Sequence, residues 1–183
     1  MPVGLWIVAG VLVLLGLTFC VIPVAAYRYG DAAQRAAEAD VRRQGAAVEL
    51  LEQHRVQFSE SGREMLFPFG IAAVLFVLAA LDLAGIGVAR VLTWILAGLL
   101  LTGGGFVTGA QLLADRYVAA AFRRSSDPAA RGLDASAVVR AAGNEFPSWL
   151  RPLQFVRFVL ATAGSIVVIV LLATSAVAAH FRS

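Results

Sequence analysis

The chain opens on an uncharged stretch of 27 residues, MPVGLWIVAGVLVLLGLTFCVIPVAAY (residues 1–27). Three further stretches without a formal charge cover residues 65–81, 91–114 and 158–179. A helix needs ~20 apolar residues to cross a hydrocarbon core of ~30 Å, so these lengths are close to that of a membrane span. The 183-residue chain is 60% hydrophobic and only 15% charged, which argues against a water-soluble domain.

We therefore predict an all-α integral membrane protein, built as a four-helix transmembrane bundle that forms a single domain over residues 1–183. The expected spans are residues 3–27, 66–84, 89–113 and 156–179. The first stretch is longer than the 7–15 apolar residues of a signal peptide, so we expect it to remain as a span.

A tight hairpin is expected between the second and third spans, because Gly85-Ile-Gly87 follows directly on the apolar run. The other two connections, residues 28–65 and 114–155, are long and polar. With four spans, both long connections must lie on one side of the membrane. Both termini and the hairpin then lie on the other side.

The long connections are predicted to form a helical layer. Asp31 is a candidate N-cap, and Gly45 is a candidate hinge between two short antiparallel helices. In the second connection, residues 111–124 contain no helix breaker and should continue the third span. Asp134 is expected to cap a short helix that ends near Ala142.

The arginines predict the orientation. All 15 basic residues are Arg, and 13 of them lie in or beside the two long connections, against Arg90 and Arg182 on the other face. Since positive residues are retained in the cytoplasm, the layer should be cytoplasmic and both termini outside. The absence of Lys suggests a GC-rich bacterial genome, and hence a bacterial plasma membrane. Basic residues that flank spans also argue against nucleic acid as a partner.

Asp82 is the only carboxylate within an expected span. An ionisable residue at membrane depth is a functional hypothesis by default, here a proton or cation site. The alternative is structural: Arg90 lies across the Gly85-Ile-Gly87 turn and can pair with Asp82. We expect the ion pair, which would hold the hairpin together.

Small residues mark the third and fourth spans. Gly105 and Gly109 have the small-xxx-small spacing that lets helix backbones approach in lipid, and Gly98 precedes them. Ala161 and Ser165 repeat the spacing in the fourth span. These faces are expected to pack within the bundle, or to dock another membrane protein or a second copy of the chain.

The layer carries a basic rim. Anionic lipid headgroups are its expected partner, since each basic residue near a membrane surface contributes about 1 kcal/mol. The candidate headgroup contacts are Arg123, Arg124, Arg151 and Arg157.

Catalytic and metal-binding patterns are absent from the sequence, and we expect no cofactor. His54 and His180 have no His, Cys or carboxylate one helical turn away, and the lone Cys20 sits among apolar residues. The expected function is a non-catalytic accessory, assembly or regulatory subunit of a membrane system. A small transporter or channel that uses Asp82 is the first alternative. An interfacial lipid-modifying enzyme that uses Glu64, Asp115 or Glu145 is the second.

Overall fold

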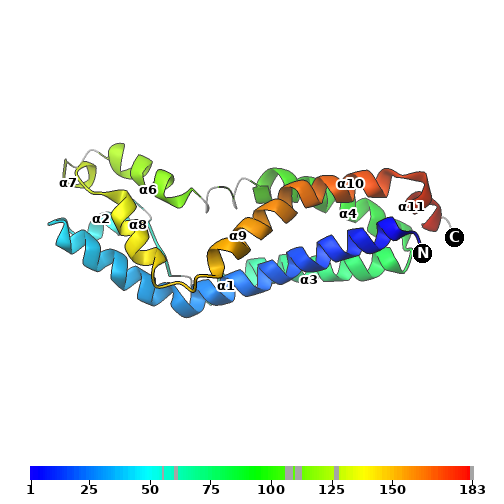
Figure 1. The fold of residues 1–183 in the computed structure, drawn as a ribbon, viewed down its shortest axis with the longest axis horizontal. Coiled ribbons are helices and arrows are strands. Elements are labelled where there is room, and N and C mark those ends of the chain that lie inside the picture. Colours follow the sequence, from blue (N-terminus) through cyan, green and yellow to red (C-terminus); the bar gives the residue numbers. More distant parts are fainter. Residues whose placement is uncertain (55, 60–61, 106–108, 110–112, 126–127, 182–183) are drawn as a thin grey trace.

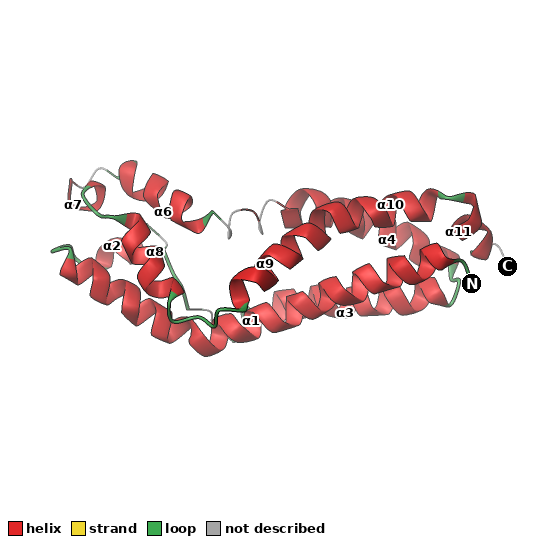
Figure 2. Ribbon diagram, viewed as in Figure 1, coloured by secondary structure: helices red, strands yellow, loops and turns green. Residues whose placement is uncertain are grey.

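The computed structural model describes residues 1–54, 56–59, 62–105, 109, 113–125 and 128–181, and every regular element in these residues is a helix (Figures 1 and 2). Four helices are long and apolar enough to cross a membrane. They are α1 (Val3–Arg43), α3 (Leu66–Leu83), α4 with the π-helical turn η1 (Gly87–Gly104), and α9 continuing through η2 into α10 (Leu150–Ala173).

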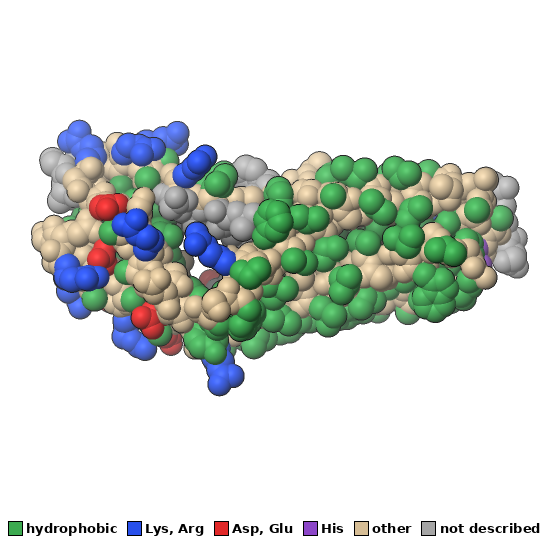
Figure 3. Space-filling view, in the orientation of Figure 1, with side chains coloured by type: hydrophobic (Ala, Val, Ile, Leu, Met, Phe, Trp, Pro, Cys, Tyr) green, Lys and Arg blue, Asp and Glu red, His purple; other side chains and the backbone are tan. Residues whose placement is uncertain are grey.

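The molecule is elongated and has two parts (Figure 1). The four long helices lie side by side in one part, which we call the apolar part. Its far end, the terminal end, holds both termini and the turn between α3 and α4. The two polar connections meet at the opposite end and form the helical layer, so the predicted pairing of connections is confirmed. Figure 3 shows the same division, with apolar side chains over one part and nearly all charged ones over the other.

The apolar part is built around α1, which packs against α3, α9 and α10, while α4 closes the ring by contacting α3 and α10. Leu5, Leu15, Leu75 and Leu172 are fully buried in its core. The outer surface is apolar as well, with Trp6 at 59% exposure as one example. A surface of this kind suits hydrocarbon rather than water.

Helix α1 does not end where the first apolar stretch ends. It runs without a break to Arg43, so Asp31 lies inside the helix and the predicted N-cap there is wrong. The reason is a stripe of small residues at helical spacing after the span, Gly30, Ala33 and Ala37, which keeps one face buried. The predicted break at Gly45 is confirmed, since this residue has φ +76° directly after the helix.

The helical layer has a core of its own. Four short helices form it, α2 (Glu49–Gln53), α6 (Ala114–Arg123), α7 (Pro128–Arg131) and α8 (Ala135–Gly143). Helix α8 packs along the second half of α1, and α6 packs on α8 (Figure 1). Phe122, Val138 and Leu51 are buried there against Ala33 and Ala37. The layer is therefore a packed unit and not a pair of loose loops.

The predicted cap at Asp134 is confirmed. Its Oδ1 accepts hydrogen bonds from the backbone N–H groups of Ser136 (2.9 Å) and Ala137 (3.1 Å). Gln44 joins this cap to the end of α1, because its Oε1 accepts from the Asp134 N–H at 2.7 Å. Its amide also donates to Asp40 Oδ2 at 2.8 Å. These bonds fix α8 against α1.

Two span boundaries need correction. The third span was expected to continue as one helix to residue 124, and its stretches 106–108 and 110–112 lie outside the described residues. Leu113 has non-helical dihedrals and α6 begins anew at Ala114. The fourth span begins at Leu150, earlier than expected, because Pro152 is tolerated in a first helical turn. It breaks at Thr174, whose ψ of 144° is extended, before α11 (Ser175–His180).

Candidate functional site

Asp82 is fully buried near the terminal end, on the face of α3 that meets α4. Its Oδ2 accepts a hydrogen bond from the hydroxyl of Thr93 on α4 at 2.8 Å, and Thr93 is itself fully buried. The other carboxylate oxygen, Oδ1, is buried without a hydrogen-bond partner among the described residues. A buried carboxylate oxygen left unpaired costs free energy, which makes Asp82 a candidate functional residue.

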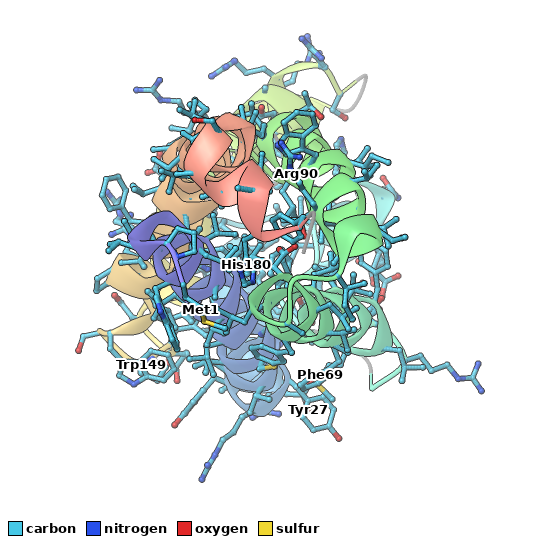
Figure 4. All side chains as sticks on the ribbon, turned by 90° about the vertical axis from the view of Figure 1, so that its right-hand side faces the viewer. Met1, Tyr27, Phe69, Arg90, Trp149 and His180 are labelled. Atoms are coloured by element: carbon cyan, nitrogen blue, oxygen red, sulfur yellow. The ribbon has the colours of Figure 1, made fainter. Side chains whose placement is uncertain are left out.

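The predicted ion pair between Asp82 and Arg90 is wrong. Arg90 instead donates from Nε (3.0 Å) and Nη2 (2.7 Å) to the backbone carbonyl of Leu172. The chain breaks at Thr174, so this carbonyl lies in the last turn of α10, where helix carbonyls lack partners and attract cations. The guanidinium also lies over the Trp94 ring, 5.5 Å from its centroid. Figure 4, seen from the terminal end, shows Arg90 beside the last helices.

His180 lies at the terminal end and is partly buried. Its Nε2 lies 3.3 Å from the Leu83 carbonyl, at the last turn of α3. Gly85, with φ +76°, passes directly beneath the ring, and a Cβ there would lie 3.1 Å from His180 Nε2. Figure 4 places His180 near the centre of this end. The last turn of α11 therefore packs over the α3–α4 turn.

The third and fourth spans each contain a π-helical turn, which sequence reasoning missed. These are η1 (Leu100–Gly104) and η2 (Leu160–Gly164). In each, a backbone N–H reaches back five residues, from Gly105 to Leu100 and from Ser165 to Leu160. Both turns fall on a shared pattern, since the segments LLTGG and LATAG both read L-x-T-x-G, 60 residues apart.

The threonine of each pattern supports its turn. Thr102 Oγ1 donates to the Gly98 carbonyl at 3.0 Å, and Thr162 Oγ1 donates to the Phe158 carbonyl at 2.7 Å. Such bonds satisfy backbone carbonyls in the wider π-helical turn, where the regular backbone hydrogen bonds of the α-helix are interrupted. The two turns face each other, since a Cβ on Gly104 would lie 3.8 Å from the Cβ of Ala161.

Most of the predicted packing residues lie where these two helices meet. A Cβ on Gly105 would lie 3.0 Å from Thr162 Cγ2, and one on Gly109 would lie 3.7 Å from the Phe158 ring. Ala161 and Ser165 are buried. Gly98 is the exception, because no other helix described in the structure places an atom within 4 Å of its Cβ position. Of its two expected roles, packing within the bundle is therefore wrong, and docking of another helix stays a prediction.

A cavity of about 810 Å³ separates the helical layer from the apolar part. It is lined by α1, α6, α8, the first turn of α9, and the segments that precede α3 and α9. Figure 3 shows this region as a hollow between the two parts, with arginine side chains beside it. Arg140 and Arg151 belong to its lining. Its volume lies within the ~300–1,000 Å³ typical of ligand sites.

The four arginines proposed as headgroup contacts lie in two different environments. Arg123, Arg124 and Arg151 are exposed. Arg157 is only 5% exposed, with its guanidinium carbon 5.5 Å from the centroid of the Phe19 ring on α1. A headgroup cannot reach a side chain held this deeply, so the prediction for Arg157 is wrong. Its aliphatic stem and charged head are part of the contact between α9 and α1.

Comparison with known proteins finds no match: no protein family, no curated protein and no solved structure is detectably similar to this chain. Among the described residues, no three His, Cys, Asp or Glu side chains are grouped closely enough to hold a metal ion. The function must therefore be inferred from the arrangement of this chain's own residues.

Proposed function

We propose that the protein is a non-catalytic accessory, assembly or regulatory subunit in a bacterial plasma membrane, with its four apolar helices inserted as a bundle. In this proposal both termini face outward and the helical layer lies in the cytoplasm, as the arginine distribution favours. The observation that supports the role best is the layer itself, which has its own packed core and is joined to the membrane part through the unbroken helix α1.

The outward face of the third span is the proposed contact for a second membrane protein or a second copy of the chain. Gly98 and Gly103 both have open space beside them, so a partner helix could approach the backbone there. The basic rim, including Arg123 and Arg124, would meanwhile rest on anionic lipid headgroups. No nucleic acid is part of the proposal.

Purification in a mild detergent, followed by mass spectrometry, tests this role. We expect a stoichiometric membrane partner or a defined oligomer with the unaltered chain. Gly98→Leu should remove it without unfolding the protein, because the new side chain enters open space. Gly10→Leu is the matched control, since Gly10 on α1 also faces open space. A monodisperse monomer free of other proteins would contradict the proposal.

A small transporter or channel is the second candidate, favoured by one observation. Asp82 keeps a buried carboxylate oxygen without a partner, as a site for a proton or a small cation would. If this candidate is correct, proteoliposomes should show proton or monovalent-cation flux that Asp82→Asn abolishes and that Asp31→Asn, on an exposed position of α1, leaves unchanged. Absence of flux from the unaltered protein would exclude it.

A further inference from the structure

The cavity between the two parts lies where a membrane surface would meet the protein. Ile22 and Ala26, near the end of the first apolar stretch, form one wall. Leu150 and Arg151, in the first turn of the fourth candidate span, form another. Tyr27 and Trp149 adjoin these walls and are 54% and 46% exposed. Tyr and Trp are enriched at the headgroup level of bilayers, so the cavity opens at that level.

The charges around the cavity are of one sign. Its described lining includes Arg140 and Arg151 and no Asp or Glu. Arg151 takes part in none of the ion pairs found among the described residues. Arg140 reaches only Asp134, at 3.9 Å and with both side chains more than half exposed, a contact of little strength. Both guanidinium groups are available to an anion.

The remaining lining is amphipathic. Val139, Phe146 and Leu150 offer apolar surface, whereas Asn144 and Gln154 offer amide donors beside the arginines. An occupant that satisfies this lining has a compact anionic group and an apolar chain. A soluble anion would leave the apolar walls uncovered, and a neutral hydrocarbon would leave the arginines without a counter-charge.

We propose that this cavity binds one anionic phospholipid from the bilayer, with its phosphate between Arg140 and Arg151. The acyl chains leave along the apolar wall formed by α1 and α9. The bound lipid fills the space between the helical layer and the membrane part and so couples them. This site is independent of any partner subunit.

Native mass spectrometry of the full chain in a non-ionic detergent tests the proposal, with phosphatidylglycerol as the probe and phosphatidylcholine as the uncharged comparison. One phosphatidylglycerol per chain should bind in preference to phosphatidylcholine. Arg140→Gln with Arg151→Gln should weaken that binding about 30-fold, if each arginine contributes as basic residues at membrane surfaces do. Arg28→Gln with Arg63→Gln removes the same charge from exposed positions outside the cavity and should weaken binding less than about threefold.

A second variant distinguishes binding inside the cavity from attraction of the lipid by surface charge. Val139→Trp fills the space and keeps both arginines, so it should also prevent binding. Equal binding of the two lipids, or an equal loss in the Arg28/Arg63 control, would overturn the proposal. Displacement of the lipid by an equal concentration of glycerol 1-phosphate would overturn it as well, since the ligand would then be a soluble phosphate ester.

Discussion

Replacing Phe122 with alanine should unfold the helical layer while the four apolar helices remain packed. Phe122 is 1% exposed and is the largest fully buried side chain described in the protein. Its ring makes a T-shaped contact with the His54 ring, 5.4 Å between centroids, and belongs to the cluster that includes Leu51 and Val138. Truncating a buried Phe costs about 3–5 kcal/mol, which is comparable to all that a core this small can supply.

Hydrogen exchange followed by mass spectrometry measures this directly. In Phe122→Ala, amides of α6 and α8 should exchange much faster, whereas those of residues 5–22 in α1 should keep their protection. Phe155→Ala is the control, because this ring on α9 is 57% exposed and contributes nothing to the layer core. Loss of protection throughout the chain would show that the layer and the apolar part unfold as one unit, contrary to the expectation.

The helices of the apolar part could be predicted because their signals are local. Uncharged stretches of adequate length determine the four candidate spans, and Gly85-Ile-Gly87 supplies the flexible turn between two of them. Asp134 was predictable for the same reason, since an N-cap depends on the few residues that follow it. The continuation of α1 to Arg43 could not be predicted in this way. Its stripe of Gly30, Ala33 and Ala37 stabilises the helix only when the rest of the layer packs against it.

The polar contacts at the terminal end could not be predicted from spacing. Arg90 and Asp82 flank a turn, but the choice of partner depends on a backbone break at Thr174 on a distant helix. No proline or glycine at that position signals the break. The π-helical turns are a different case, because both fall on L-x-T-x-G segments that are visible in the sequence, but such a pattern alone does not specify a π-helical turn.

Removing Asp82 together with its partner should stabilise the protein. The buried Oδ1 without a hydrogen bond is expected to cost about 1–3 kcal/mol. The bond from Thr93 offsets only part of this, since side-chain hydrogen bonds within membranes average about 0.6 kcal/mol. Asp82→Ala with Thr93→Val should therefore raise the free energy of unfolding by about 1–2 kcal/mol. Thr93→Val alone should lower it, because the carboxylate then loses its one side-chain donor.

Unfolding by sodium dodecyl sulfate in mixed micelles, followed by circular dichroism, gives these free energies. The same measurement distinguishes the observed contacts from the ion pair expected at first. Asp82 and Arg90 bond to different groups, so the effects of Asp82→Ala and Arg90→Ala should add within about 0.5 kcal/mol. The effects of Asp82→Ala and Thr93→Val on the free energy of unfolding should not add, because each substitution removes the same hydrogen bond. A strong coupling between Asp82 and Arg90 would mean that Arg90 is a partner of the carboxylate. If the variant with both Asp82→Ala and Thr93→Val is less stable than the unaltered chain, the carboxylate has another partner at this end of the molecule.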